Sequence, residues 1–288
     1  MTEVSVSEFV EHRPAPPLRP LVARYTGYRQ VGLAPGRHRG LPSPYLTLIF
    51  TLDEPLEVAA HPDPRTPPGR YATLVGGLHT APALITHPGR QSGIQLALSP
   101  LGARALLGLP AGELAGLDVD AAEVFGASGR ELHERLLAAG GWPERFALLD
   151  RFLAPRAAAA TPPRPEVAHA WRRLLAGGGA APVAELAREV GWSPRYLGRR
   201  FDVEIGLSPK AVARVVRFDR ARRRLQRRAG TGPDLALADL AAGCGYYDQA
   251  HLAREFRSLA GCPPSRWLWE EFRYVQAGPA PALPDSGP

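Results

Sequence analysis

The first part of the chain carries a hydrophobic pattern typical of β-structure. Short runs rich in β-branched and aromatic residues occur at 45–52 (YLTLIFTL), 71–75 and 93–98, and each predicts a strand. Stretches rich in Pro and Gly at 61–70 and 76–90 separate these runs and predict loops. Short strands at this spacing favour a small sandwich or a cupin-like barrel.

The pattern becomes helical in the next part of the chain. Apolar residues recur three and four positions apart in three segments, which predicts helices over 101–109, 129–139 and 144–153. Residues 154–165 (APRAAAATPPRP) show no periodicity, and their Ala and Pro content indicates a semi-extended linker. Residues 276–288 are rich in Pro, and we expect them to form a disordered tail.

Residues 166–275 have a helical pattern almost throughout and contain an internal repeat. The repeated positions are Leu186-Ala187, Gly191, LGRRF at 197–201, Gly206 and Pro209 in one copy, and Leu240-Ala241, Gly245, LAREF at 252–256, Gly261 and Pro264 in the other. The offset between the copies is 54 residues in the first part and 55 in the second, so the second copy has one added residue near its turn. A repeat of this kind predicts one supersecondary unit that occurs twice.

Each copy has the features of a helix-turn-helix unit. In the first copy, a helix over 183–190 leads to Gly191, where the chain turns sharply because positive φ is cheap only for Gly. Ser193 is expected to cap the second helix, with Pro194 at its first position. The helical spacing then separates a buried stripe of Leu197, Phe201 and Ile205 from an exposed side of Arg195, Tyr196 and Arg199.

The second copy repeats this organisation. Its supporting helix carries Leu237, Leu240 and Ala241 on the inner side, and the helix that follows buries Leu252, Phe256 and Leu259. Gln249, His251 and Arg254 stay available on the exposed, N-terminal side of that helix. The aromatic residues near the turns are interpreted as core or edge residues: Trp192, Tyr246, Tyr247 and Trp267. We expect Cys244 and Cys262 to be small buried thiols.

A long helix is predicted between the copies, from Ser208-Pro209 to about Arg228. Its apolar face comprises Val212, Val215, Val216, Phe218, Ala221 and Leu225. The remaining surface is crowded with Arg214, Arg217, Arg220, Arg222, Arg223, Arg224, Arg227 and Arg228. Such a run is usually a solvated face. We expect some of these arginines to pair with acids such as Asp219 and others to reach DNA phosphates.

The net charge of +7 is concentrated in the helical part of the chain. Residues 1–160 hold 15 basic and 15 acidic residues, whereas residues 161–277 hold 20 basic and 12 acidic residues. This local excess indicates a polyanionic partner, and nucleic acid is favoured over a membrane surface. Residues 1–17 lack the apolar core of a signal peptide, and no apolar run approaches the roughly 18 residues of a membrane span. We therefore expect a cytoplasmic protein.

Residues 166–275 closely resemble the DNA-binding domain of the AraC/XylS transcription regulators. The resemblance rests on ELAREVGWSPRYLGRRFDVEIGLSPKAV (185–212), RFDRARRRL (217–225) and LADLAAGCGYYDQAHLAREFRSLAGCPPSRW (237–267). It implies seven helices, in which a linker helix holds two DNA-reading helices on one face of DNA. Residues 93–114 (GIQLALSPLGARALLGLPAGEL) are similar to the N-terminal regions of some members, which implies a sensor or pairing domain.

The resemblance also implies DNA contacts at matching positions of this chain. The implied base-contacting residues are Arg195, Gly198 and Arg199 in the first copy and Gln249, Ala250, His251 and Arg254 in the second. Members usually carry a longer polar residue where this chain has Gly198, and Ala250 offers only an apolar contact, such as one to a thymine methyl. We interpret a further set as candidate contacts to the DNA backbone: Ser193, Tyr196, Arg200, Lys210, Asp248 and Arg257. Arg200 and Arg257 are equally well explained as surface ion-pair partners.

The predicted class is therefore α+β. It combines a β-rich regulatory domain with helices over 1–153, a linker over 154–165, and an all-α domain with two helix-turn-helix units over 166–275. The expected function is sequence-specific regulation of transcription, without catalytic residues, metal or cofactor. Double-stranded DNA is the expected partner, and a small-molecule effector, RNA polymerase and a second copy of the chain stay open as others.

Three competing functions also stay open. A DNA-repair enzyme that transfers alkyl groups would need a reactive or zinc-binding Cys in residues 1–160, which contain none. A metal-dependent enzyme in this half would have only His38, His79 and His87 as ligands. Their spacing matches no close metal pattern, so we interpret them as scattered surface histidines. A non-specific architectural protein would barely distinguish an operator from random DNA.

Overall fold

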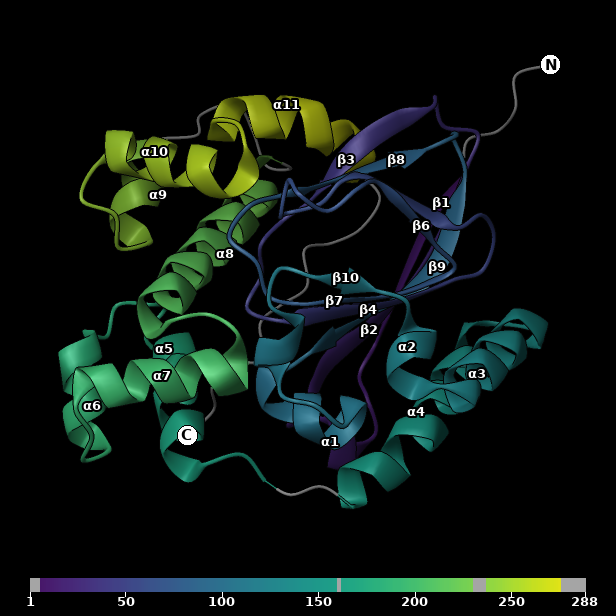
Figure 1. The fold of residues 1–288 in the computed structure, drawn as a ribbon. Coiled ribbons are helices and arrows are strands. Elements are labelled where there is room, and N and C mark those ends of the chain that lie inside the picture. The colour runs from purple at the N-terminus through teal and green to yellow at the C-terminus, as the bar shows by residue number, and fades with distance from the viewer. Residues whose placement is uncertain (1–5, 160–161, 230–236, 276–288) are drawn as a thin grey trace.

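The structure is a computed structural model that describes residues 6–159, 162–229 and 237–275. Two β-sheets and short helices form the first part, and seven helices form the second part (Figure 1). The predicted α+β class is thus confirmed, and the β-rich part is a sandwich. The tail predicted for residues 276–288 lies outside the described residues.

All strand pairings in the two sheets are antiparallel. The strands are β1 (Val6–His12), β2 (Val22–Val31), β3 (Gly36–Gly40), β4 (Leu46–Thr51), β5 (Leu56–Ala60), β6 (Gly69–Tyr71), β7 (Thr73–Gly76), β8 (Ala83–His87), β9 (Gln91–Leu98) and β10 (Asp118–Val119). One sheet has the order β1-β2-β9-β4-β7-β10, and the other has the order β3-β8-β5-β6.

Helices cover the outer face of the six-stranded sheet. Three 3-10 turns, η1 (Pro16–Leu18), η2 (Pro100–Gly102) and η3 (Ala111–Leu114), accompany α1 (Ala103–Leu107), α2 (Ala121–Phe125), α3 (Ala127–Ala138) and α4 (Trp142–Ala158). Figure 1 shows α1 to α4 on one side of this sheet and the four-stranded sheet on the other. Side chains alternate accordingly along β4: Leu46, Leu48 and Phe50 join the hydrophobic core, whereas Thr47 and Ile49 face the space between the sheets.

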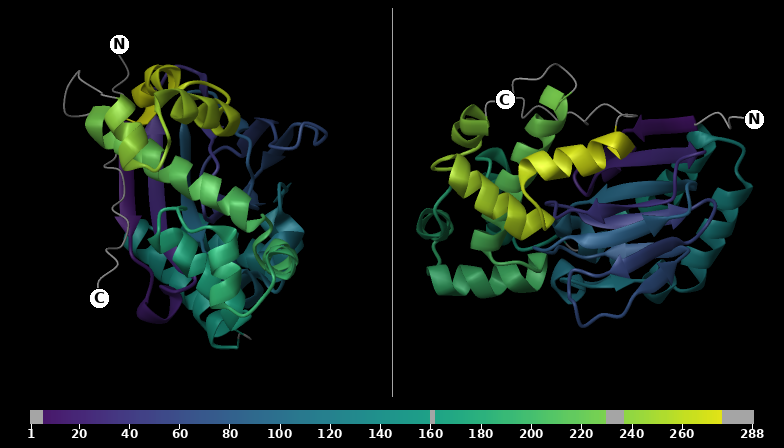
Figure 2. Two further views of the ribbon diagram at one scale, coloured as in Figure 1. Left: turned by 90° about the vertical axis from the view of Figure 1, so that its left-hand side faces the viewer. Right: turned by 90° about the horizontal axis from the view of Figure 1, so that it is seen from above.

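The second part contains the seven helices that the resemblance implied. They are α5 (Pro165–Ala176), α6 (Val183–Glu189), α7 (Pro194–Ile205), α8 (Pro209–Ala229), α9 (Leu237–Gly243), α10 (Gln249–Ala260) and α11 (Pro264–Val275). The two helix-turn-helix units are α6–α7 and α9–α10. They lie at opposite ends of α8, on the same side of the molecule (Figures 1 and 2).

Several local predictions for the first part are wrong. Strand β6 starts within 61–70 and β8 lies within 76–90, the stretches predicted as loops, because Pro and Gly around these short strands hide their pattern. The segment predicted as a linker starts inside a helix, since α4 continues to Ala158 with Pro155 within it. Alanine has a high helix propensity, and here it outweighs the one backbone hydrogen bond that the proline removes.

The hydrophobic cores do not follow the expected domain boundary. One continuous core joins the helix-covered face of the six-stranded sheet to the first helix-turn-helix unit, so Leu96 and Leu98 belong to the same cluster as Leu197 and Phe201. The second unit has a separate core with α8 and α11, which includes Phe218, Phe256 and Trp267. The first unit is therefore built onto the β-rich part, whereas the second unit has its own core.

Candidate nucleic-acid interface

Both helix-turn-helix units have the predicted turn and cap. Gly191 and Gly245 adopt positive φ, 71° and 78°, where any other residue would be strained. At the start of α7, the Ser193 hydroxyl accepts a hydrogen bond from the Tyr196 N–H at 3.2 Å. At the start of α10, the Asp248 carboxylate accepts one from the His251 N–H at 2.6 Å. Ser193 and Asp248 are thus helix caps that leave the first turn of each helix open to solvent.

The predicted buried stripes of α7 and α10 are confirmed. Leu197, Phe201 and Ile205 are fully buried, as are Leu252, Phe256 and Leu259. The opposite faces carry the candidate base-contacting residues, of which Arg195, Arg199, Gln249, Ala250 and Arg254 are exposed and Gly198 and His251 are half-buried. A Cβ added at Gly198 would meet no atom within 4 Å, so the surface of α7 is open at this position. The structure therefore places these seven residues on accessible surface, in two groups.

His251 has a second role at the turn. Its Nδ1 accepts a hydrogen bond from the Tyr247 N–H at 3.2 Å, and its ring packs edge-on against Tyr246 at 5.3 Å. Nδ1 is occupied as an acceptor, so Nε2 carries the proton and is the atom left to donate to another group.

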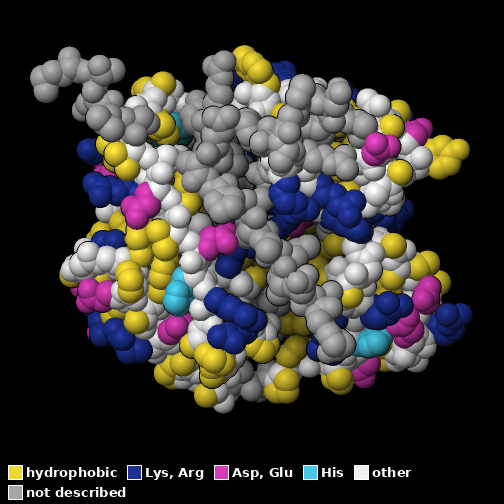
Figure 3. Space-filling model, turned by 180° about the vertical axis from the view of Figure 1, so that it is seen from behind, with side chains coloured by type: hydrophobic (Ala, Val, Ile, Leu, Met, Phe, Trp, Pro, Cys, Tyr) yellow, Lys and Arg dark blue, Asp and Glu magenta, His cyan; other side chains and the backbone are white. Residues whose placement is uncertain are grey.

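The candidate backbone contacts surround the two helices. Lys210 and Arg257 are exposed, and Tyr196 is 42% exposed and packs edge-on against Trp192. The guanidinium of Arg200 lies 5.6 Å from the Tyr196 ring, so this arginine is partly held by its own helix. Figure 3 shows a broad group of Lys and Arg side chains in the half of the molecule that contains the C-terminal helices.

Most arginines of α8 stabilise the fold. Arg214 pairs with Glu255 of α10 at 2.9 Å, and the guanidiniums of Arg217 and Arg224 donate to the carbonyls of Gly179 and Gly243. Asp219 pairs with Arg222 and Arg223 at 2.7 Å each. The pairing expected for Asp219 is therefore confirmed. Arg220 and Arg227 take part in no ion pair with another described residue, and they are the better candidates for phosphates.

The prediction for one aromatic residue is wrong. Tyr246 and Trp267 are buried, as expected, but the side chain of Tyr247 is 92% exposed. Tyr246 is buried beside it and packs against the His251 ring. Cys244 and Cys262 are buried, as predicted.

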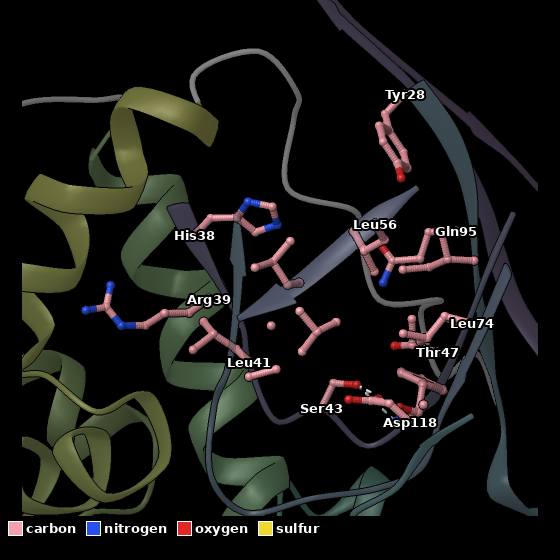
Figure 4. Close-up of a pocket in the computed structure, with 18 of the residues that line it drawn as sticks. Tyr28, His38, Arg39, Leu41, Ser43, Thr47, Leu56, Leu74, Gln95 and Asp118 are labelled. Carbon is pink, nitrogen blue, oxygen red and sulfur yellow. Dashed lines mark hydrogen bonds between the residues drawn. The ribbon is translucent and has the colours of Figure 1, made fainter. Parts of the chain in front are cut away.

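A second candidate site is a cavity of about 370 Å³ between the two sheets, α8 and α11. Figure 4 shows Tyr28, His38 and Gln95 pointing into this space, whereas Arg39 points away toward the C-terminal helices. There Arg39 pairs with Glu270 of α11 at 2.7 Å. The sequence singled out His38 only as a possible metal ligand and did not indicate the cavity; the missed signal is the series of polar residues on the inner face of the strands, such as Gln91 and Gln95 of β9.

The prediction that the histidines of this region are scattered over the surface is wrong. The rings of His38 and His87 lie 6.1 Å apart because β3 and β8 are paired, and His87 is buried. Burial, followed by the nearby His87, lowers the pKa of His38 to about 4, so its ring is neutral at neutral pH. The described residues contain no group of three His, Cys, Asp or Glu side chains placed to hold a metal ion.

Positive charge collects at the end of the cavity next to α8. Arg24 of β2 lines the cavity and takes part in no hydrogen bond or ion pair with a described residue. Burial lowers its pKa, and Arg223 and Arg222 lower it further. Asp219 pairs with both Arg222 and Arg223. Three guanidiniums therefore gather at this end of the cavity.

Comparisons with known proteins found family matches in both parts of the chain. Residues 186–269 match a family described as a helix-turn-helix domain, and residues 10–120 match a domain of unknown function. An HTH-type transcriptional regulator, Rv1931c of Mycobacterium tuberculosis, is 31% identical over 90 residues, which is 31% of this chain and 33% of that protein. The chain thus spans about a third of the length of this curated relative.

Solved structures are similar to a larger share of the chain. A ligand-free point variant of ToxT from Vibrio cholerae strain SCE256 matches 85% of this chain and 97% of that chain, with a TM-score of 0.51 and 9% identity. ToxT of Vibrio cholerae O395 matches 85% and 96%, with a TM-score of 0.48 and 10% identity. The likeness to the ligand-free variant, with its TM-score above 0.5, concerns the fold alone.

None of the described helices is both long and apolar enough to cross a bilayer. The chain thus contains a helix-turn-helix domain over residues 186–269, as its resemblance to the AraC/XylS transcription regulators implied.

Proposed function

We propose that the chain regulates transcription by binding a specific site on double-stranded DNA through α7 and α10. The observation that carries this proposal is the placement of two capped, solvent-exposed reading helices at the ends of one helix, on the same side of the molecule. Two such helices suit neighbouring major grooves about one helical turn, roughly 34 Å, apart. The two copies differ in sequence, so the site need not be a palindrome.

The exposed side chains suit base reading in the major groove. Arg195 and Arg199 could each contact a guanine through O6 and N7, and Gln249 suits adenine by the same geometry. Arg254 and the protonated Nε2 of His251 are further donors on α10. The candidates for phosphates are Ser193, Tyr196, Arg200, Lys210, Asp248 and Arg257; Ser193 and Asp248 act there through the helix N-termini that they cap.

Selection of bound sequences from random DNA with the full chain tests the proposal. Enrichment of one site with two separated blocks of fixed bases is expected. A set of single-base variants of that site then tests Arg199→Ala, which should weaken binding and relax base choice at one position. Arg130 is exposed on α3 and away from the reading helices, so Arg130→Ala is the matched control. Equal binding of selected and random duplexes at one salt concentration would favour an architectural role instead.

We also propose that the cavity between the sheets binds a small-molecule effector. The cavity touches the regulatory part through Arg24 and both α8 and α11 through Arg222 and Trp267, so an occupant contacts both parts of the chain. Volumes of this size are usual for ligand sites. Because Arg24 lines the cavity and forms no ion pair with a described residue, it favours an organic anion over a neutral molecule.

Thermal unfolding of the full chain with a series of carboxylates and their neutral amides tests the effector proposal. Carboxylates should raise Tm more than the amides do, and Arg24→Gln should remove the difference. Arg29→Gln is the control, because Arg29 lies on the same strand but is exposed. Pairing of two copies, contact with RNA polymerase and a cytoplasmic location remain proposals; sedimentation of the full chain tests the first.

A further inference from the structure

Tyr247 is the one residue by which the second helix-turn-helix unit exceeds the first. Trp192 and Tyr246 are equivalent, because their N–H groups donate to the carbonyls of Ala187 and Ala241 at the same distance, 2.9 Å. The caps Ser193 and Asp248 are equivalent too. One position separates Tyr246 from Asp248, and none separates Trp192 from Ser193. The added residue is therefore Tyr247.

The structure holds the backbone of Tyr247 and leaves its side chain without a role in the fold. The backbone N–H donates to Nδ1 of His251 at 3.2 Å. The side chain is 92% exposed, the highest value among the large hydrophobic residues that the structure describes, and the next is Trp269 at 67%. The ring makes no aromatic contact or hydrogen bond with another described residue. The ring is therefore available for a contact with another molecule.

The position of Tyr247 points to DNA. It directly precedes the cap of α10, and Gln249 and Ala250 follow in the first turn of that helix. The N-terminus of a reading helix is the end that approaches base edges, so a side chain one step outside it meets the sugar-phosphate strand that borders the groove. A base stack is a poor alternative, because bases in an intact duplex are already stacked on each other.

We propose that Tyr247 anchors the second unit to the DNA backbone, with its ring against a sugar and its hydroxyl donating a hydrogen bond to a phosphate oxygen. This inference rests on the proposed DNA binding. The first unit has no residue at this position, so the anchor acts on the second groove alone. His251 contributes by holding the Tyr247 backbone while its own Nε2 stays free for DNA.

The test uses the full chain and a duplex recovered by selection from random DNA. Tyr247→Phe removes only the hydroxyl and is expected to raise Kd about threefold, whereas Tyr247→Ala removes the ring as well and is expected to raise it about tenfold. Both losses should be equal across single-base variants of the site, because a phosphate contact carries no sequence information. The salt dependence should stay unchanged, since tyrosine is a neutral donor.

Two controls and a second readout separate the outcomes. Leu137→Ala removes an exposed apolar side chain from α3, and it should leave Kd unchanged. Ethylation of single phosphates should weaken binding of the natural chain at one phosphate next to the second half-site, and Tyr247→Phe should lose that sensitivity. Unchanged Kd in Tyr247→Phe, or a loss confined to one base variant, would overturn the proposal. If the natural chain enriches no sequence at all, the proposed function itself fails.

Discussion

Arg104 and Glu204 join the two parts of the chain through a two-pronged ion pair, with Nε–Oε2 at 2.8 Å and Nη2–Oε1 at 3.0 Å. Arg104 belongs to α1 of the β-rich part, and Glu204 lies in the last turn of the reading helix α7. The pair is therefore a direct contact between the β-rich part and the C-terminal end of α7.

A double-mutant cycle on Arg104→Ala and Glu204→Ala should show coupling of about 0.5–1 kcal/mol in the free energy of unfolding. The value is modest because the Arg104 side chain is 41% exposed, although the two-pronged geometry is favourable. Urea unfolding of the full chain measures it. Additive single effects would show that the pair does not contribute to the junction.

A glycine at the same junction tests the close packing of η3 on α7. A Cβ on Gly112 would lie 2.3 Å from the carbonyl oxygen of Val203, which is backbone and cannot move aside cheaply. Gly112→Ala should therefore lower the free energy of unfolding by roughly 1–3 kcal/mol in urea titrations.

The matched substitution on α7 should act in the opposite direction. A Cβ on Gly198 meets no atom within 4 Å, and the residue lies inside a helix. Gly198→Ala should therefore raise the free energy of unfolding by about 0.5–1 kcal/mol. If both alanine variants behaved alike, the close contact at Gly112 would be contradicted.

The ion-pair group on α8 should be sensitive to loss of its acid. Asp219 and Arg223 are both 3% exposed, so Asp219→Asn removes a carboxylate that pairs with a buried guanidinium. We expect a loss of about 3–5 kcal/mol in the free energy of unfolding. Glu131 pairs with Arg135 on exposed surface at 3.7 Å, and Glu131→Gln is the control that should change little. Equal losses in the two variants would contradict the proposed importance of burial.

The histidine in the cavity predicts a dependence of stability on pH. The folded-state pKa of His38 is lowered from 6.5 to about 4, so the unfolded chain binds a proton between these values and the folded chain does not. The stability is complete above pH 6.5 and falls as the pH drops toward 4, by an amount on the order of 1–3 kcal/mol. Urea unfolding at pH 7.5 and pH 5 measures the loss. His38→Gln should reduce it, and an unchanged pH slope would refute this prediction.

The sequence predicted the second part of the fold better than the first for a physical reason. Turn glycines, helix caps and apolar stripes in α6, α7, α9 and α10 are local signals, and Gly191, Ser193 and Asp248 adopt the conformations expected of them. Strands such as β8 depend on partners far along the chain, and their short, Pro-flanked sequences carry little local information.

The candidate sites also differ in how far local sequence could predict them. Exposure of Arg195, Arg199 and Arg254 follows from helical spacing, so the sequence was sufficient to place them on the surface. The partners of the α8 arginines, the cavity at Arg24 and the exposure of Tyr247 depend on which segments meet in space. The sequence of an arginine run does not indicate whether its members contact Asp219, a backbone carbonyl or a phosphate.

The shared core of the first unit has a consequence for engineering. A chimaera that joins residues 166–275 to a foreign sensor would inherit one self-sufficient reading unit and one whose apolar underside, including Leu197 and Ile205, has lost its cover. Such a graft should aggregate or bind only half of its site. Recombination of this regulator therefore has to carry the η2 and η3 turns of the β-rich part, which pack on α7, along with the DNA-binding helices.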